Sequence, residues 1–441
     1  MVWSVRNYLF NSKKFGWILY AGNSGSVIGL TDEMFGQVDN LKRGDFSTLE
    51  ENSLALLKEY GVIIDMTDDD LLNIMAAKSI KARCSNYLFG LSICPSNSCN
   101  FNCTYCFEAK GFRNPEKNDS SVFEVMNRRT IKNILNYVKT TNSRRVDITI
   151  FGGEPLLSIE SIINFHNEIK QMHLETHYDI ITNGYLLSSE NIEILDSLPV
   201  ETYQVTIDGP AEMHNKKRPH LEDEDSYSQI MANLNSFASY FKNRENKPAM
   251  HIRVNIDRLN KDVFHTLYYE IKENFPSNFI PYSAFVFDES GENKNVLLPH
   301  EQANFILDNF HNHNIFEYQH FEKKFKIGHC MADAVNSIVV DSKGDVYKCL
   351  NDIGIDDKML FSMDKCENYN DLLEASYLVK SSPFLDEDCR KCFLFYSCFG
   401  GCPRKRLCGK KECLPLKHNP DALLEIYFEK LSTLNKGVNS C

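Results

Sequence analysis

The chain of 441 residues is 43% hydrophobic, so it is long and apolar enough to fill the cores of two or three domains. A net charge of −12 argues against a nucleic-acid surface, which requires clustered Lys and Arg. The first twenty residues contain no uninterrupted apolar segment of the signal-peptide type, and no apolar run of about 18 residues occurs anywhere. We therefore expect a cytoplasmic protein that binds neither nucleic acid nor membrane.

The cysteines are clustered rather than spread. Of the fifteen, four lie between Cys94 and Cys106, and ten lie from Cys330 onward. Fifteen cysteines would suggest disulfides in a small secreted domain, but clustered cysteines in a large leaderless chain more often bind metal or do redox chemistry. This distribution predicts metal or redox sites in a reducing compartment.

Residues 1–80 begin with extended pieces around a turn at Gly22–Gly25, followed by helix start signals at Thr31 and at Ser47. This order of strands and then helices resembles the small winged-helix peptide-recognition domain of enzymes that mature ribosomally made peptides. A barrel-capping extension without a ligand is the alternative, because no residue here has distinctive chemistry. Residues 65–82 are predicted to form a linking helix.

The middle of the chain alternates strand-like and helix-like segments. Six strand candidates end at Cys94, Gly153, Gly184, Gly209, Asp257 and Phe287. Several of them are near-continuous apolar runs, as parallel strands covered on both faces tend to be. Helical periodicity appears between them, for example over 123–139 and 159–173. We predict an α/β fold with a partial (β/α)6 barrel of the TIM type.

Glycines and polar residues follow several of these strands: Gly152-Gly153-Glu154-Pro155, Thr182-Asn183-Gly184 and Asp208-Gly209-Pro210. In a βα barrel the reactive face lies at the carboxyl ends of the strands. We therefore expect these loops to meet the cysteine loop that follows the first strand.

That loop has the spacing Cys99-x3-Cys103-x2-Cys106. A zinc site requires four ligands, and neither Cys94 nor the distant His166 has natural spacing for the fourth. In a cubane cluster of four irons, three cysteines leave one iron open to a non-protein ligand. Together with Tyr105 before the last cysteine and the later Gly-Gly-Glu-Pro sequence, the loop resembles that of the radical SAM enzymes.

The resemblance implies that a [4Fe–4S] cluster on Cys99, Cys103 and Cys106 binds S-adenosylmethionine (SAM) and yields a 5′-deoxyadenosyl radical. It assigns the Gly-Gly-Glu-Pro segment to the methionine part of SAM, with Glu154 accepting a bond from the ammonium group. Arg253 would pair with the SAM carboxylate, unless it forms a structural ion pair. The complete predicted SAM-binding set is Tyr105, Gly152, Gly153, Glu154, Pro155, Thr182, Asn183, Asp208, Arg253 and Asn255.

Seven later cysteines resemble the SPASM domain, which holds two auxiliary [4Fe–4S] clusters in some radical SAM enzymes. The resemblance implies one cluster on Cys330, Cys349 and Cys402, and another on Cys389, Cys392, Cys398 and Cys413. Cys408 competes with Cys413, which we prefer because the sequence after it resembles the closing segment of the family. A two-zinc ribbon is the alternative. Residues 337–349 are predicted to form a hairpin that turns at Lys343-Gly344.

The remaining cysteines carry no predicted role. Cys84 and Cys94 are interpreted as ordinary buried thiols, and Cys366 and Cys441 as incidental.

These resemblances predict a peptide-recognition domain over 1–80, a radical SAM barrel over 81–315 and a SPASM domain with two clusters over 316–441. We expect a radical SAM peptide maturase that cross-links a ribosomally synthesised precursor carrying a leader, with flavodoxin or ferredoxin as electron donor. A thioether is favoured because residues 331–348 contain no fourth cysteine, so an open iron could bind a substrate thiolate. Asp333, Asp341 or water could fill that position instead.

Three other functions remain open at this point. The first is a carbon–carbon cross-link in the peptide. The second is formylglycine formation by an anaerobic sulfatase-maturing enzyme, although Leu350 follows Cys349 where those enzymes carry an aspartate. The third is a non-catalytic iron–sulfur or zinc module.

Overall fold

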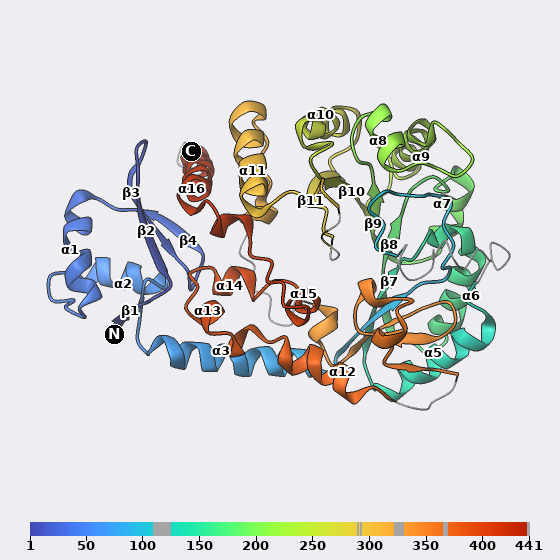
Figure 1. Ribbon diagram of the computed structural model, residues 1–441, viewed down its shortest axis with the longest axis horizontal. Coiled ribbons are helices and arrows are strands. Elements are labelled where there is room, and N and C mark those ends of the chain that lie inside the picture. Colours follow the sequence, from blue (N-terminus) through green and yellow to red (C-terminus); the bar gives the residue numbers. More distant parts are fainter. Residues whose placement is uncertain (109–124, 289–290, 292, 322–329, 365–368, 439–441) are drawn as a thin grey trace. The chain divides into compact units, whose positions relative to one another are not determined.

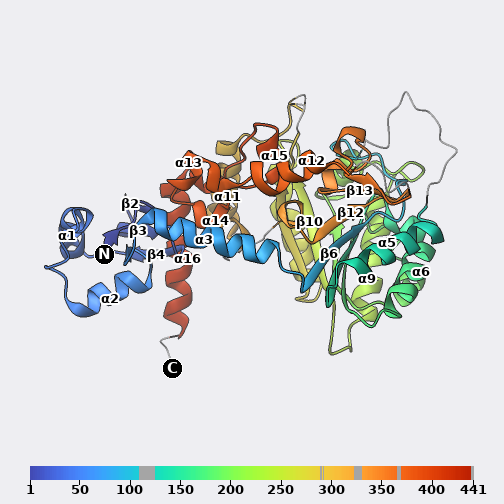
Figure 2. The same ribbon diagram turned by 90° about the horizontal axis from the view of Figure 1, so that it is seen from below.

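The computed structural model describes the chain except residues 109–124, 289–290, 292, 322–329, 365–368 and 439–441. The chain divides into two compact units, the first comprising Met1–Arg83, Leu298–Cys330 and Tyr377–Cys441 and the second Cys84–Leu297 and Met331–Ser376 (Figures 1 and 2). Each unit combines stretches that are distant in sequence. The division into three functional domains at 1–80, 81–315 and 316–441 therefore stays a prediction.

The second unit contains a nine-stranded sheet with the order β11-β10-β9-β8-β7-β6-β12-β13-β14. Its first six strands are mutually parallel and occur in chain order, which confirms the predicted βα series. They are β6 (Leu88–Ile93), β7 (Arg145–Ile150), β8 (Glu175–Thr182), β9 (Val200–Thr206), β10 (Ala249–Ile256) and β11 (Phe279–Phe285).

Helices connect these strands and lie along the sheet (Figure 1). They are α5 (Arg128–Thr140), α6 (Ile159–Lys170), α7 (Ser189–Leu195), α8 (Ala211–Lys217), α9 (Ser226–Tyr240) and α10 (Phe264–Asn274). The predicted helix over 123–139 starts too early, because the Asn127 side chain accepts bonds from the backbone N–H groups of Arg129 and Thr130 and caps α5. The beginning of that prediction, 123–124, lies outside the described residues.

Two of the strands, β7 and β10, do not bury their two faces equally. Along β7 and β10 a buried residue alternates with a partly exposed one. These two strands therefore bury one face fully and the other only in part, since alternate residues of a strand point to opposite faces. Arg253 and Asn255 both lie on that partly exposed face of β10.

The predicted hairpin is confirmed as β12 (Ser337–Val340) paired with β13 (Asp345–Tyr347). It also extends the parallel sheet, because β12 pairs with β6, while β13 pairs with β14 (Phe361–Ser362). The Asp341 carboxylate accepts the Lys343 and Asp345 N–H groups at the turn, each at 2.9 Å. Burial raises the pKa of Asp341 to about 7. The short helix α12 (Asp371–Ala375) completes the unit.

The N-terminal part of the first unit has the predicted order of strands and then helices. Its elements are β1 (Val2–Trp3), β2 (Asn7–Ser12), β3 (Gly16–Ala21), β4 (Ser26–Gly29), α1 (Asp32–Lys42), α2 (Glu51–Glu59), β5 (Ile63–Ile64) and α3 (Asp68–Arg83). Thr31 caps α1 as predicted, whereas Ser47 does not start a helix, because its hydroxyl bonds Asp45 and α2 begins at Glu51. The three-stranded sheet has the order β2-β3-β4, so β2 and β4 are its edges.

The rest of the first unit consists of α11 (Pro299–His313), three short helices of the cysteine-rich segment, and α16 (Pro420–Val438). The short helices are α13 (Glu387–Arg390), α14 (Phe395–Cys398) and α15 (Pro403–Leu407). Among the residues that the structure describes, no helix combines the length and apolar character needed to cross a bilayer.

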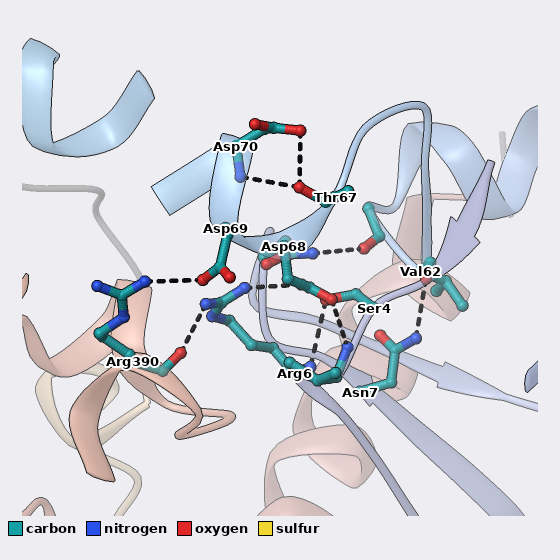
Figure 3. Close-up of polar contacts among 12 residues, drawn as sticks. Ser4, Arg6, Asn7, Val62, Thr67, Asp68, Asp69, Asp70 and Arg390 are labelled. Atoms are coloured by element: carbon teal, nitrogen blue, oxygen red, sulfur yellow. Dashed lines mark hydrogen bonds and ion pairs between the residues drawn. The ribbon is translucent and has the colours of Figure 1, made fainter. Parts of the chain in front are cut away.

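A buried arginine joins the N-terminal strands to the cysteine-rich segment (Figure 3). Arg6 is 1% exposed, and its guanidinium donates to Asp68 Oδ1 at 2.7 Å and to the Arg390 carbonyl at 2.6 Å. Arg390 in turn pairs with Asp69 at 2.8 Å. The start of α3 and the turn before β2 therefore hold the end of α13, so residues 1–80 are built into this unit rather than appended to it.

Candidate functional site

The loop carrying Cys99, Cys103 and Cys106 follows β6 and is held by backbone bonds to a distant segment. The Asn102 N–H donates to the Pro219 carbonyl at 2.8 Å, and the Thr104 N–H donates to the Lys217 carbonyl at 3.0 Å. This segment follows α8, which begins just after the strand-end loop containing Asp208. The structure thus brings the cysteine loop to a predicted strand-end loop, as the sequence pattern required.

The two glycines of the Gly-Gly-Glu-Pro segment pack against the cysteine loop. A Cβ on Gly153 would lie 2.2 Å from the Ser98 carbonyl oxygen, and one on Gly152 would lie 2.4 Å from the Cys94 sulfur. Gly152 also has φ +131°, a conformation that favours glycine. The Glu154 N–H donates to the Ser98 carbonyl at 2.8 Å. The glycines are therefore explained by contact with the cysteine loop, a reason that sequence reasoning did not find.

Glu154 is fully buried and links two strand-end loops. Its carboxylate accepts bonds from Thr182 Oγ1 and the Asn183 N–H, each at 2.7 Å, and from the Leu156 N–H at 3.0 Å. Burial raises the pKa of Glu154 more than these bonds lower it. The Asn183 side chain donates to Asn100 Oδ1 at 2.7 Å, so this loop also contacts the cysteine loop.

Tyr105 is the centre of a second polar network. Its hydroxyl donates to the Asp208 carboxylate and accepts from Asn255 Nδ2 at 3.0 Å and from Arg218 Nη1 at 2.9 Å. Asp208 also accepts the Asn255 N–H at 2.8 Å, and Arg253 Nε donates to Asn255 Oδ1 at 2.8 Å. Burial, together with the neighbouring carboxylate, raises the pKa of Tyr105, so its hydroxyl remains a donor. The predicted residues Tyr105, Asp208, Arg253 and Asn255 are thus brought together.

Two basic residues in this region were missed from the sequence. Lys217 is 1% exposed and pairs with Asp257 at 2.9 Å, and Arg218 contacts Tyr105 beside the cysteine loop. Burial lowers the pKa of Arg218, but its interactions with Cys103, Tyr105 and Asp208 outweigh that effect and leave the pKa raised. A basic pair shortly after a strand-end Asp-Gly was the signal that could have identified them.

Three residues considered earlier lie apart from this network. His166 is buried between α6 and β8, where its Nδ1 lies 3.1 Å from the Tyr178 hydroxyl. Cys94 is fully buried, as predicted. Cys84 is exposed, so its interpretation as a buried thiol was wrong: it follows directly after the last residue of α3. Cys366 and Cys441 lie outside the described residues.

Four cysteines of the first unit line one cavity. They are Cys389, Cys392, Cys398 and Cys413, the four that the sequence assigned to one auxiliary cluster. Cys408 is exposed and is not part of the lining. Burial raises the pKa of Cys398 to about 11 in this enclosed site. The geometry therefore favours Cys413 over Cys408 as the fourth ligand.

Two of the basic residues that line the same cavity contact its sulfurs. Arg406 Nη1 lies 3.4 Å from the Cys389 sulfur, and Lys417 donates a hydrogen bond to Cys413. Arg406 is itself held by the Ser381 carbonyl at 2.7 Å and by Asp386 at 3.3 Å. Positive donors at the sulfurs suit a negatively charged thiolate-bound cluster.

The other predicted auxiliary set is divided between the two units: Cys330 and Cys402 belong to the first and Cys349 to the second. It stays a prediction. Within the described parts of the chain, no group of three or more His, Cys, Asp or Glu residues is arranged to hold a single metal ion.

Comparison with known proteins agrees with this arrangement. The profile of the radical SAM superfamily matches residues 93–263. A cysteine-type anaerobic sulfatase-maturating enzyme from Clostridium perfringens is 24% identical over 76% of this chain and 91% of its own length. The radical SAM cyclopropyl synthase TigE from Paramaledivibacter caminithermalis is 22% identical over 70% of this chain and 66% of its own length.

Among solved structures, native anSMEcpe with bound AdoMet superposes with a TM-score of 0.61 at 22% identity, over 79% of this chain and 99% of that chain. The same enzyme with bound AdoMet and the Cp18Cys peptide gives a TM-score of 0.59 at 21% identity, over the same shares of the two chains. These likenesses show a radical SAM fold.

Proposed function

This chain is an enzyme of the radical SAM superfamily, and we propose that it installs a Cys thioether cross-link in a ribosomally synthesised precursor peptide. The observation that carries the proposal is the presence of two cysteine sites of different kinds. One is a three-cysteine loop at the strand ends, and the other is an enclosed cavity lined by four cysteines.

The first site fits the group that its superfamily uses, SAM with a [4Fe–4S] cluster. Cys99, Cys103 and Cys106 would hold the cluster, which together with SAM supplies a 5′-deoxyadenosyl radical. An ionised carboxylate has about four acceptor positions. Three in-chain donors contact Glu154, so one position remains for the ammonium group of SAM.

The second predicted SAM contact is on β10. The Arg253 guanidinium uses Nε to bond Asn255, which orients the side chain and leaves its two terminal nitrogens for the SAM carboxylate. Tyr105, Asp208 and Asn255 tie the cysteine loop to the ends of β9 and β10, so they act by positioning that loop.

A peptide substrate is supported by the relatives. One anSMEcpe structure contains bound AdoMet together with the Cp18Cys peptide. The edges β2 and β4 of the N-terminal sheet could accept an extended leader by β-addition, in which main-chain bonds supply affinity. Because Arg6 joins this sheet to the cysteine-rich segment, point variants test leader binding better than deletion of residues 1–80.

The thioether follows from a count of ligands. Only Cys330, Cys349 and Cys402 are assigned to the first auxiliary cluster, which leaves room for a substrate thiolate. Cleavage of SAM to methionine and the radical would consume one electron, and the radical would take a hydrogen atom from a peptide carbon. Bonding of that carbon to sulfur would release the thiol proton and one electron. Flavodoxin or ferredoxin would supply the first electron and could accept the second.

The test is incubation of the reduced, reconstituted enzyme with SAM and the peptide encoded beside its gene. We expect 5′-deoxyadenosine, a product two hydrogens lighter per link, and one fewer alkylatable cysteine. Loss of two hydrogens with every cysteine still alkylatable would instead establish a carbon–carbon link. Three cubane clusters require about twelve irons per chain, and reconstitution to only four would remove both auxiliary clusters from the proposal.

Formylglycine formation is the second candidate, favoured by the similarity to the cysteine-type sulfatase-maturating enzyme. Leu350 stands where the resemblance places an aspartate in those enzymes. A Cys-containing sulfatase peptide can be incubated with the enzyme and probed with a hydrazide reagent. An aldehyde product would establish this activity in place of cross-linking.

A further inference from the structure

An open pocket beside the edge strand β2 lies next to the four-cysteine cavity. Its empty volume is about 760 Å³, and all of its lining residues belong to the first unit. They are Val5, Asn7, Tyr8, Asp388, Lys391, Cys392, Phe393 and Lys417. One wall is thus the start of β2, and the other is the segment that carries the cysteines.

The pocket presents net positive charge in a protein of net charge −12. Lys391 and Lys417 are both exposed lining residues. Asp388, the acidic residue in the lining, pairs with Lys411 at 3.1 Å. The pocket therefore suits an anionic group of modest size.

The walls also suit an extended peptide. Tyr8 stacks on Phe393 with ring centroids 4.6 Å apart, so the two rings form an apolar part of the pocket lining. Asn7 and Tyr8 begin β2, whose outer edge carries no other strand among the described residues. A strand added at this edge would bring its side chains to the pocket, since alternate residues of a strand point to the same face.

Three residues, Asp388, Cys392 and Lys417, belong to both the pocket and the cavity. Cys392 is one of the four cysteines, and Lys417 donates to the Cys413 sulfur. Arg406 lines the cavity but not the pocket, whereas Lys391 lines the pocket but not the cavity. A variant of Lys391 therefore perturbs the pocket alone, and a variant of Arg406 perturbs the cavity alone.

We propose that this pocket binds an Asp or Glu side chain of the precursor peptide lying along β2, and that binding lowers the reduction potential of the cluster held by Cys389, Cys392, Cys398 and Cys413. The inference rests on the proposed peptide substrate. A carboxylate at Lys417 offsets a positive charge that otherwise favours the more negative, reduced cluster. By reciprocity, reduction of the cluster weakens binding of the acidic peptide by the same factor.

The experiment uses reconstituted full-length enzyme and dye-labelled, C-terminally amidated decapeptides, each made with a central Glu and as a matched Gln peptide. We expect a Glu peptide to bind about tenfold more tightly than its Gln partner, as one charge-assisted bond predicts. Lys391→Gln and Lys417→Gln should remove this preference, and Arg406→Gln should preserve it. Because Lys391 and Lys417 are exposed, loss of folding is not expected.

The second readout is the midpoint potential of the cluster whose electron paramagnetic resonance signal disappears in Cys413→Ser. Saturating Glu peptide should lower that potential in the wild type and in Arg406→Gln, but not in Lys417→Gln. Arg406→Gln should itself start from a lower potential. Equal affinity of Glu and Gln peptides, or a potential that does not respond to bound Glu peptide, would overturn the inference.

The outcomes also separate this inference from the proposed function. Unchanged modification of the precursor by Lys391→Gln and Lys417→Gln, with unchanged KM, would overturn the pocket and leave the function intact. Binding of Glu peptides without any SAM-dependent modification would support the pocket and overturn the function. Loss of flavodoxin affinity in both lysine variants, without any effect on peptides, would assign the pocket to an acidic electron carrier and overturn the inference.

Discussion

The cysteine loop of the barrel and the four-cysteine cavity each bring several thiols together, but the contacts that do so differ. Cys99, Cys103 and Cys106 lie on a strand-end loop whose shape depends on partners more than a hundred residues away, such as Lys217 and Pro219. The cavity draws its four cysteines from the 25 residues Cys389 to Cys413. A reactive site needs a free position and a defined environment, whereas an enclosed cluster needs only complete ligation and compensating charge.

The two regions also shift the pKa of a nearby carboxyl group in opposite directions. Beside the loop, Glu154 is desolvated and its pKa is raised. Beside the cavity, burial acts to raise the pKa of Asp386, but Lys411, the Cys389 N–H and Arg406 outweigh it and hold the pKa at about 2. The first environment is suited to binding a cationic ligand group, and the second to holding a negatively charged cluster.

The largest effect should come from removing the ligands of the loop alone. Replacing Cys99, Cys103 and Cys106 together by Ala should lower 5′-deoxyadenosine formation by at least a thousandfold, about 4 kcal/mol of barrier, because SAM cleavage needs the cluster at this site. About eight irons should remain in the auxiliary sites. Chromatographic detection of 5′-deoxyadenosine and an iron assay measure both, and persistent SAM cleavage would contradict the division of roles.

The cavity can be tested with a matched pair of cysteine variants. Cys413→Ala should lose about four irons per chain, because it removes one of four ligands from an enclosed cluster. Cys408→Ala should retain full iron content, since Cys408 is exposed and outside the cavity lining. The reverse pattern of iron contents would reassign the fourth ligand to Cys408.

The support of the loop by distant residues predicts a stability effect. Lys217→Met leaves the Asp257 carboxylate buried without its ammonium partner, which should cost about 3 kcal/mol of unfolding free energy. The control is Arg244→Ala, whose pair with Asp196 is at 2.6 Å but has the arginine 45% exposed, so its loss should lower the unfolding free energy much less. Anaerobic denaturant unfolding measures both, and equal losses would show that burial of the Lys217 pair is unimportant.

The smallest expected effect concerns pH. Because the folded pKa of Asp386 lies below the usual value, its charged form stabilises the fold above pH 4, and this contribution disappears as the pH falls toward 2. Asp386→Asn should therefore lower the unfolding free energy by about 1–2 kcal/mol at pH 7 and flatten its pH dependence between about pH 4 and pH 2.

The pH dependence expected from Glu154 is opposite to that expected from Asp386. Its raised pKa means that the folded protein holds the proton more tightly, so stability falls as pH rises from the unfolded pKa through the folded one. Glu154→Gln should therefore remove the fall in stability that accompanies rising pH. It should leave the loss of stability at acidic pH unchanged. The same slope in both variants would show that the two regions do not differ in this way.

Much of the barrel could be predicted because the relevant signals are local. Apolar runs define the six strands, and parallel strands must place their carboxyl ends at one edge, so the loops at Glu154, Asn183 and Asp208 converge on the cysteine loop. The resemblance to radical SAM and SPASM enzymes likewise led to the cysteine loop and to the four cysteines that line the cavity.

Contacts between distant segments could not be predicted in this way. Sequence patterns state that Arg218, Lys217 and Arg6 are basic and therefore favour the surface, yet each is buried against a partner far along the chain. The pairing of β12 with β6 and the packing of Gly153 against Ser98 could not be predicted from the local sequence either. Each contact joins segments that are far apart in the chain. The sequence by itself predicted which residues would bind a cluster and SAM. The tertiary structure decided which charges lie beside those residues, because the strength of a buried charge depends on what the fold places beside it.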